Sequence, residues 1–285
     1  MQAEEVTVGE AAVSFQCAGD RLVGILHRTP EPTRRGVLIV VGGPQYRIGA
    51  HRQFVSLARK FCAEGIPVFR FDARGMGDSD GELQGFESIS QDIAAAIDAF
   101  QAAEPGIERV VLWGLCDGAS AAAFYGHQDP RVAGMVLVNP WVRSEATQAE
   151  ATLKHHYGRR IADPETWRRL ASGKISLGQS IGSIAGSLRT SIAARVGTAK
   201  VAASLPERVI DAIDRFEGPI LLVLCGNDFT AQEFLVAARK SDTGRQVLEA
   251  PRVTQRHLPE ANHTFSKKTW RDEIAAQTIS WLGDL

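Results

Sequence analysis

The chain has 285 residues, of which 44% are hydrophobic and 23% are charged, and its formal net charge is −1. This composition is ordinary for a soluble globular protein, and the length suits one large α/β domain or two small ones. A nearly neutral chain gives no reason to expect nucleic acid as a partner. The sequence shows neither a signal-peptide pattern nor an apolar run long enough to cross a bilayer, so we expect a cytoplasmic protein without a membrane span.

The four cysteines, Cys17, Cys62, Cys116 and Cys225, are widely spaced and form no C-x-x-C pair. Such spacing argues against a disulfide framework and against a zinc site. We therefore expect reduced thiols and no metal. No glycine-rich run has the spacing of a dinucleotide or nucleotide-phosphate loop, so we expect no cofactor either.

Taken in chain order, the predicted elements begin with two alternating runs, 6–15 and 22–28, which flank Ala18-Gly19-Asp20 and indicate a hairpin. Apolar runs rich in β-branched residues then predict strands at 36–41, 66–71, 109–115, 132–138, 219–224 and, more weakly, 253–258. Helical patterns lie between or after these strands, at 52–64, 88–102, 118–127, 231–240 and 270–281. Strands that alternate with helices predict an α/β fold, with a mostly parallel eight-stranded sheet flanked by helices.

One segment interrupts the alternation, because residues 142–208 show helical patterns but no strand. We predict a helical lid at 142–206, inserted into a core that residues 1–141 and 207–285 form. The segment 142–208 carries 11 Lys or Arg against 5 Asp or Glu, a net charge of +6 in a chain whose total is −1. This charge favours an anionic substrate or partner, such as coenzyme A or an acyl-carrier protein, with Arg159 and Arg160 as candidate contacts. Solvated helix faces would carry the same charge.

A candidate nucleophile lies in the stretch VVLWGLCDGASAAAF, which reads as strand, turn and helix. Its turn, Gly114-Leu115-Cys116-Asp117-Gly118, matches the G-x-S-x-G nucleophile elbow with a cysteine in place of the serine. Cys116 would then lie at a helix N-terminus, where the dipole favours a thiolate. Taken alone, the same letters also fit a buried structural cysteine.

A candidate acid and base follow the last two predicted strands. Asp228 ends the run Cys225-Gly226-Asn227-Asp228, and His263 lies in the run Ala261-Asn262-His263-Thr264-Phe265. The order nucleophile, acid, base is that of the α/β-hydrolase triad, and each residue follows a strand. We expect Asp228 to orient His263, which would draw the proton from Cys116. Taken singly, Asp228 also fits a helix cap, and His263 a polar loop residue.

The loop after the first core strand, in LIVVGGPQYRIGAHRQF, is where α/β-hydrolases place one oxyanion donor. The expected pair of donors is the N–H of Gly43 and that of Asp117. Pro44 has no N–H, so Gln45 is the alternative to Gly43. Gln45 and His51 are also candidate substrate contacts.

The stretch FRFDARGMGDSDG is similar to the D-x-R-G-x-G-x-S motif of α/β-hydrolases. Together with GGPQYRIGAHRQF, GLCDGASAA and CGNDFTAQEF, it resembles the hydrolases associated with the exosortase A system, over nearly the whole chain except 142–208. These occur in Gram-negative bacteria that make exopolysaccharide and sort proteins with a PEP-CTERM tail. The resemblance implies a cytoplasmic α/β-hydrolase with the triad Cys116, Asp228 and His263, and it fixes no substrate. The cysteine departs from most α/β-hydrolases, although dienelactone hydrolases and polyester synthases of this fold also use one.

The chemistry of sulfur narrows the expected substrates. A thiolate is a strong nucleophile and also a good leaving group, which favours esters, lactones and thioesters over peptides. We therefore expect a thiol-dependent acyl hydrolase that acts on a small-molecule ester or thioester through an acyl-enzyme intermediate. An acyltransferase with an acyl-coenzyme A or acyl-carrier donor would use the same residues. A non-catalytic binding protein is the least favoured alternative, because it has no need of all three triad positions.

Overall fold

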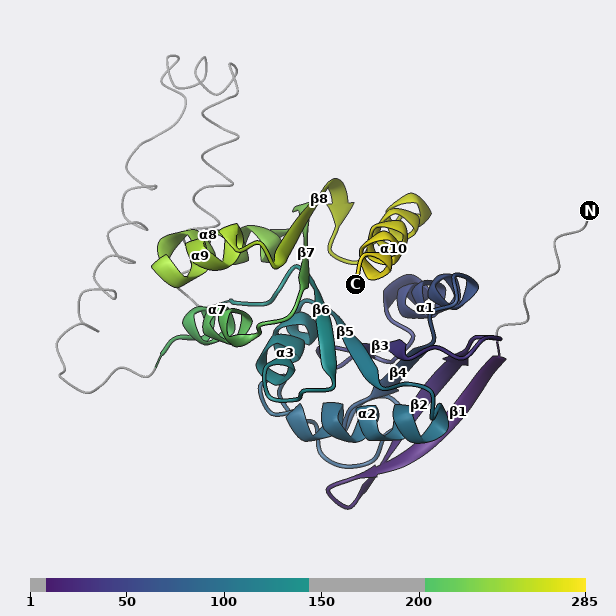
Figure 1. The fold of residues 1–285 in the computed structure, drawn as a ribbon. Helices are drawn as coiled ribbons and strands as arrows, with labels where there is room; N and C mark the ends of the chain where they lie inside the picture. Colours follow the sequence, from purple (N-terminus) through teal and green to yellow (C-terminus); the bar gives the residue numbers. More distant parts are fainter. Residues whose placement is uncertain (1–8, 144–202) are drawn as a thin grey trace, which may run out of the picture.

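The computed structural model describes residues 9–143 and 203–285, which fold around one eight-stranded sheet (Figure 1). The strands lie in the order β1-β2-β4-β3-β5-β6-β7-β8. Their bounds are β1 Gly9–Cys17, β2 Asp20–Arg28, β3 Arg35–Val40, β4 Val68–Asp72, β5 Arg109–Leu115, β6 Val132–Val138, β7 Ile220–Asn227 and β8 Val253–Asn262. The pairings from β4 to β8 are all parallel, which confirms the predicted mostly parallel sheet.

The predicted hairpin forms the edge of the sheet, where β1 pairs antiparallel with β2 and β2 with β4. The two turn residues, Ala18 and Gly19, have φ values of 50° and 94°. Positive φ at both positions gives the turn a twist that matches the right-handed twist of paired strands. The small side chains at this turn therefore fix the register in which Cys17 faces Asp20.

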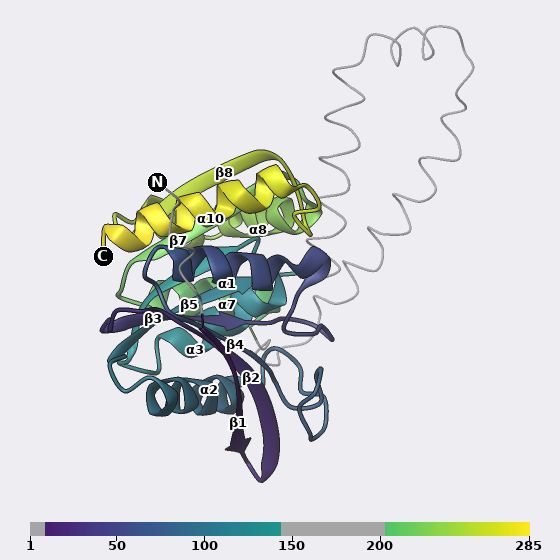
Figure 2. The ribbon, with the colours of Figure 1, turned by 90° about the vertical axis from the view of Figure 1, so that its right-hand side faces the viewer.

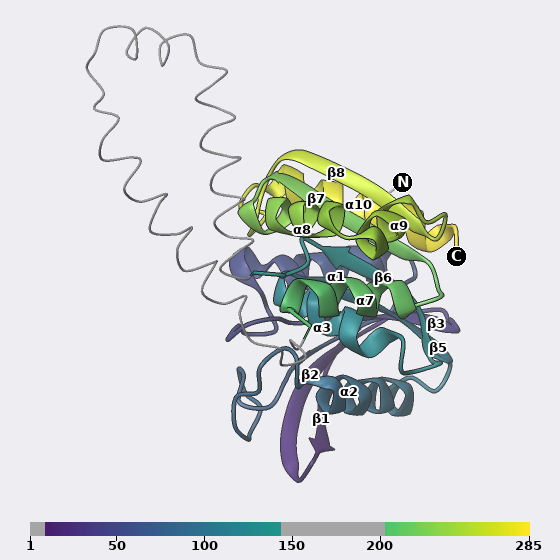
Figure 3. The same cartoon turned by 90° about the vertical axis from the view of Figure 1, so that its left-hand side faces the viewer.

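Helices cover both faces of the sheet. Their bounds are α1 Gln53–Ala63, α2 Ser90–Ala103, α3 Asp117–Gly126, α7 Leu205–Arg215, α8 Phe229–Lys240, α9 Asp242–Glu249 and α10 Lys268–Gly283, with a short 3₁₀ helix at Ala50–Arg52. Helices α1 and α10 lie side by side on one face, and α2, α3 and α7 lie on the other (Figures 2 and 3). Because both faces are covered, the central strands are buried along most of their length, as Leu38, Val111 and Leu137 show.

The sequence patterns did not predict α7 or α9. Helix α7 begins at Leu205 with a capping box between Ser204 and Glu207, and it packs against α3. It thus runs across residue 206, where the sequence suggested the boundary between lid and core. Residues 144–202 of the predicted lid, with Arg159 and Arg160, lie outside the described residues, so the lid remains a prediction. Within the described ranges, no helix has the length and apolar character that crossing a bilayer requires.

The parallel strands direct the site to one edge of the sheet. Strands β3, β5, β7 and β8 all point the same way, so their carboxyl ends meet at that edge. The segments that follow these four strands carry Gly43, Cys116, Asp228 and His263. Residues separated by more than 200 positions in the sequence are thereby brought to one place.

Candidate active site

Cys116 occupies a strained turn between β5 and α3. Its φ is 62° and its ψ is −125°, a backbone conformation that costs a non-glycine residue on the order of 1–3 kcal/mol. The two glycines of the motif permit this turn because the backbone passes close to both. A Cβ on Gly114 would lie 2.4 Å from the carbonyl oxygen of Gly118, and one on Gly118 would lie 2.5 Å from that of Val40. The turn presents Cys116 at the carboxyl edge of the sheet, with 8% of the residue exposed.

His263 and Asp228 form a hydrogen-bonded pair beside this turn. Nδ1 of His263 lies 2.7 Å from Oδ2 of Asp228. The other carboxylate oxygen, Oδ1, accepts the backbone N–H of Thr230 at 2.9 Å and so caps helix α8. Asp228 therefore makes both contacts that its sequence position suggested, one with each carboxylate oxygen.

The environment of His263 favours its protonated form. Its pKa is raised to about 10, first by the hydrogen bond to Asp228 and next by a hydrogen bond to Cys116, while burial acts in the opposite direction. The ring contacts both side chains, and both contacts favour its protonated form. The structure thus brings Cys116, His263 and Asp228 into one chain of hydrogen bonds.

Asn139 is a site residue that the sequence analysis missed. It follows β6, has a φ of 46° and is fully buried. Its side-chain Nδ2 donates to Oδ2 of Asp228 at 2.6 Å, and its Oδ1 accepts the backbone N–H of Cys225 at 2.8 Å. The signal was available, because a polar residue before Pro140 ends a wholly apolar strand at the carboxyl edge.

The segment after β6 is also hydrogen-bonded to the turn that carries Cys116. The backbone N–H of Trp141 donates to the carbonyl oxygen of Cys116 at 3.1 Å, and the Ser120 hydroxyl donates to the carbonyl oxygen of Trp141 at 2.7 Å. A hollow of about 390 Å³ adjoins this part of the site, lined by Trp141, Arg143, Asn227, Asp228, Phe229, Thr230, Asn262, His263 and Thr264. Asp228 and His263 therefore border a space that a small molecule can enter.

The expected oxyanion donors have an acceptor within the protein. The carboxylate of Asp117 accepts the N–H of Gly118 at 3.1 Å, and it also accepts hydrogen bonds from the N–H groups of Gly43 and of Asp117 itself. Burial raises the pKa of this carboxyl, against the lowering effect of those three N–H groups. The alternative donor, Gln45, gives its N–H to the carbonyl oxygen of Gly43 at 2.7 Å, and the residue is exposed. Gly43 and Asp117 are thus brought together, and Gln45 does not join them.

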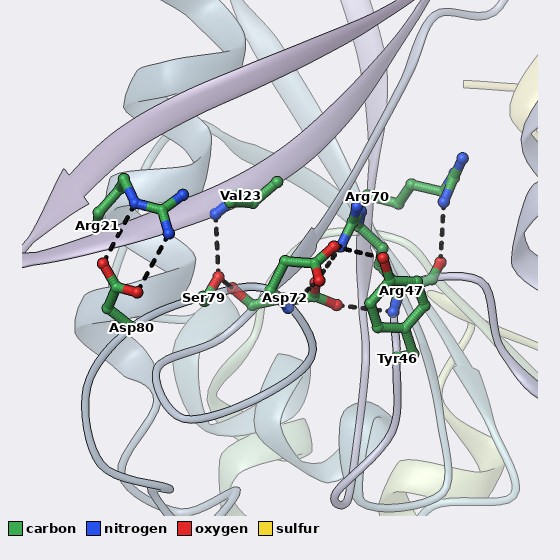
Figure 4. Close-up of polar contacts among 9 residues, drawn as sticks. Arg21, Val23, Tyr46, Arg47, Arg70, Asp72, Ser79 and Asp80 are labelled. Atoms are coloured by element: carbon green, nitrogen blue, oxygen red, sulfur yellow. Dashed lines mark hydrogen bonds and ion pairs between the residues drawn. The ribbon is translucent and has the colours of Figure 1, made fainter.

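The D-x-R-G-x-G-x-S stretch holds the loop that carries Gly43. Asp72, which ends β4 and is fully buried, accepts the backbone N–H of Arg47 at 2.7 Å and forms an ion pair with its guanidinium. Ser79 donates to the carbonyl oxygen of Asp72 at 2.7 Å and accepts the N–H of Val23 at 2.9 Å. Figure 4 shows Asp72 between these two partners, with the outer pair of Arg21 and Asp80 on the Ser79 side. The motif therefore ties the loop after β3 to the neighbouring strands.

His51 lines a basic groove beside α1 and α10, and it does not line the hollow that Asp228 and His263 border. The groove has a volume of about 420 Å³, and its polar and charged lining residues are His51, Arg52, Ser56, Arg59, Lys60, Lys268 and Arg271. Three of its cations have carboxylate partners, since Arg59 pairs with Glu10, and Lys60 and Lys268 with Asp272. In the described ranges, neither the His51 nor the Arg52 side chain has a hydrogen-bond or ion-pair partner. The same ranges hold no group of three or more side chains suited to a metal ion.

Comparison with known proteins supports this fold over most of the chain. A family model described as "Serine aminopeptidase, S33" (Hydrolase_4) matches residues 32–265. Among solved structures, the Pyrococcus furiosus esterase Pf2001 is 15% identical with a TM-score of 0.67, covering 100% of this chain and 96% of its own. Est1E from Butyrivibrio proteoclasticus, with bound ferulic acid, is 12% identical with a TM-score of 0.61, covering 96% of this chain and 98% of its own. The proline iminopeptidase of Mycobacterium smegmatis is 16% identical with a TM-score of 0.58, covering 96% and 98%.

At such low identities the structural likeness establishes the fold alone, and no curated protein matches the sequence. The family model, in contrast, spans most of the chain, from the end of the hairpin to the segment that carries His263. The chain therefore belongs to the Hydrolase_4 family of α/β-hydrolases.

Proposed function

We propose that this α/β-hydrolase is a thiol-dependent acyl hydrolase that acts on small-molecule esters or thioesters. Cys116 is the nucleophile, His263 the acid and base, and Asp228 the residue that orients His263. The observation that carries the proposal is the chain of hydrogen bonds from Asp228 through His263 to a cysteine held at a strained elbow. An imidazolium in contact with a cysteine is the arrangement that activates a sulfur nucleophile.

The reaction would proceed in two steps. Sγ of Cys116 attacks the carbonyl carbon as a thiolate, and the π electrons of the carbonyl move to its oxygen. When the carbonyl re-forms, the bond to the leaving group breaks, and the leaving group takes a proton from His263. Water, deprotonated by His263, then attacks the acyl thioester and releases the acid and the Cys116 thiolate. Asp228 stays ionised and holds the ring by Nδ1 throughout.

Sulfur chemistry separates this proposal from peptide hydrolysis. In a tetrahedral adduct with an amide, the thiolate leaves more readily than an unprotonated amine, so the adduct reverts. An alkoxide or a thiolate leaving group competes with Cys116 on more equal terms. The family description names a serine peptidase, and two structural neighbours are named as an esterase and a ferulic acid complex. The cysteine nucleophile favours ester substrates over peptide substrates.

A phosphate-bearing thioester is the substrate class that the basic groove favours, with hydrolysis and acyl transfer as the two outcomes. The groove runs along α1 beside the first turn of α10, and Arg52 at its α1 end has no ion-pair partner among the described residues. Both helices follow strands of the parallel sheet and begin at its carboxyl edge. Both helix dipoles add positive potential at that end. The predicted lid contributes further positive charge. A coenzyme A or acyl-carrier donor fits this arrangement, and the resemblance to exosortase-associated hydrolases is compatible with such a donor.

The experiment that tests the nucleophile is intact-protein mass spectrometry after incubation with a panel of activated esters and acyl thioesters. We expect one acyl group on Cys116, mapped by peptide digestion, and none on the Cys116→Ala variant. If the alanine variant is acylated equally, or if no acyl donor modifies the wild type while turnover is seen, Cys116 is not the nucleophile.

A second measurement tests the groove. An acyl-coenzyme A should have a higher kcat/KM than a neutral ester of the same acyl group, and the ratio should fall as salt rises, since exposed charges are screened beyond roughly 8 Å at physiological ionic strength. Arg52→Glu should lower the ratio, whereas Arg256→Glu, an exposed arginine on β8, should not. Equal ratios for both variants would mean that the groove does not receive the donor.

A further inference from the structure

The carboxylate of Asp117 lies where the oxyanion of a substrate is expected. In this fold, the N–H groups of Gly43 and Asp117 are the expected oxyanion donors, and both are hydrogen-bonded to this carboxylate. The backbone at Gly42 and Gly43 also lies close to the Asp117 carboxylate. A Cβ on Gly42 would lie only 2.0 Å from Oδ1 of Asp117, and one on Gly43 would lie 3.2 Å from Oδ2. The loop after β3 therefore closes around the carboxylate.

This placement has a direct electrostatic consequence. A substrate's carbonyl oxygen gains negative charge when Cys116 attacks, and it needs the same N–H groups that Asp117 holds. If the carboxylate stayed nearby as an anion, it would also repel the new charge in a partly buried site where such interactions are strong. The internal carboxylate and the oxyanion therefore exclude one another.

The surroundings of Asp117 offer little else to hold it as an anion. It borders a pocket of about 210 Å³ whose side-chain lining is mostly apolar, chiefly Val41, Pro44, Met76, Leu83, Phe86 and Ile89. The lining residues from the loops after β3 and β4 carry no ionisable group. The titratable group that faces Asp117 is His263, from the segment after β8, whose charge when protonated attracts the carboxylate.

We propose that Asp117 determines which substrates this site accepts, because its carboxylate occupies the amides that an oxyanion needs and has to be neutralised or displaced before acylation. The proposal rests on the function proposed above. A simple neutral ester brings nothing that displaces a carboxylate, so it reacts slowly with the resting protein. A substrate that fills the apolar pocket pushes the Asp117 side chain off the amides and gains them for its own carbonyl oxygen.

A purely structural role would have a different signature. Asp117 is the first residue of α3, and its bond to the N–H of Gly118 lies within the first helical turn. An asparagine keeps an acceptor of the same shape and removes only the charge. Asp117→Asn therefore separates a structural acceptor, which it preserves, from a competing anion, which it abolishes.

The test is the acylation rate of Cys116 by p-nitrophenyl acetate under single-turnover conditions, for wild type, Asp117→Asn and Asp117→Ala. We expect Asp117→Ala, which frees the oxyanion donors, to acylate about tenfold faster or more than wild type at neutral pH. Asp117→Asn keeps the acceptor and removes only the charge, so it should also acylate faster than wild type, because the side chain no longer repels the oxyanion. Asp284→Asn, an exposed carboxylate near the end of α10, is the matched control and should acylate at the wild-type rate. Thermal denaturation of each variant checks folding, and Asp117→Asn alone decides the result if Asp117→Ala does not fold.

A pH profile gives an independent readout. In the wild type, acylation should accelerate as the pH falls toward the pKa of Asp117, which burial raises, because the neutral carboxyl no longer competes. This acceleration should be missing from Asp117→Asn.

The alternative outcomes are distinct. Equal acylation rates in the wild type and both variants would overturn the proposal and leave a structural acceptor. Slower acylation in both variants would also overturn it, because Asp117 would then assist the reaction. If none of the four proteins is acylated by any ester or thioester, the proposed function fails and this inference fails with it.

Discussion

Asn139 donates its side-chain amide to the same carboxylate oxygen of Asp228 that binds His263, at a distance of 2.6 Å. The oxygen thus receives two donors from two different strand ends. Because the amide oxygen of Asn139 is itself held by the backbone of Cys225, the amide cannot turn without breaking a buried hydrogen bond. The orientation of Asp228 is therefore fixed by β6 and β7 together.

We predict that Asn139 acts as a positioning residue. Asn139→Ala should lower kcat by about tenfold or more with little change in KM, and should shift the alkaline limb of the pH–rate profile, because Asp228 loses the partner that aligns it with His263. Asn139→Asp should be worse, since it places a second carboxylate against Asp228. A variant that loses stability but keeps its pH–rate profile would show that Asn139 serves only the fold.

Alkylation should distinguish Cys116 from the other three cysteines. All four are buried, but burial raises the pKa of Cys17, and it raises that of Cys62 and of Cys225 to about 12, so these three stay as unreactive thiols near neutral pH. Cys116 is hydrogen-bonded to His263, whose protonated form would favour the thiolate, and should be carbamidomethylated first by iodoacetamide. Peptide mapping over time measures this, and equal labelling of Cys62 or Cys225 in the folded protein would contradict it.

Substitution of Cys116 should separate activity from stability. Cys116→Ala should abolish turnover and leave the Tm nearly unchanged, because the side chain faces the site. Cys116→Ser should keep only a small fraction of the activity, since an alkoxide is harder to form than a thiolate. Cys116→Gly should be inactive and at least as stable as the alanine variant, because glycine adopts a φ of 62° without strain. Serine activity equal to wild type would remove any special role for sulfur.

The raised pKa of His263 makes stability depend on pH in a defined window. Its pKa is about 10 when folded and about 6.5 in an unfolded chain, so its protonation stabilises the fold fully below pH 6.5 and less as the pH rises toward 10. The free energy of unfolding should therefore fall between pH 7 and pH 9. Solvent screening reduces the contribution of His263 to the free energy of unfolding, because its side chain is 37% exposed.

Chemical denaturation of wild type and His263→Gln at pH 7 and pH 9 measures this contribution. The buried thiols also titrate on unfolding, but both proteins contain them, so only the difference between the two reports on His263. We expect a smaller pH dependence in the variant. Identical slopes would mean that His263 is neutral in the folded protein.

The predicted fold was confirmed most closely where burial alone fixes the structure. Strands β5 and β6 have the predicted bounds, 109–115 and 132–138, because continuous runs of β-branched and apolar residues fit only a strand covered on both faces. Helix α7 was missed even though Ser204 and Glu207 form a capping box, because its apolar face, with Val209 and Ile213, follows a long segment of helical pattern. Nothing in that pattern shows where one helix ends and the next begins.

Some features of the candidate site could likewise be predicted from the sequence, and others could not. Cys116, Asp228 and His263 could be predicted to lie together because strand order places them at one edge of the sheet. The second partner of Asp228 and the inward turn of the Asp117 carboxylate could not. Both depend on where a side chain points once several strand ends have met, and residue spacing carries no information on that direction.

Ionic contacts help to hold the loop that carries Gly43. The guanidinium of Arg47 lies between the carboxylates of Asp72 and Asp78, and its backbone N–H also binds Asp72. A denaturant that is itself a guanidinium ion competes for those carboxylates, whereas urea has no charge with which to do so. In guanidinium chloride this loop should therefore unfold locally before the sheet unfolds. Catalytic activity should then be lost while the strands are still paired. In urea the loss of catalysis and the loss of the sheet should coincide.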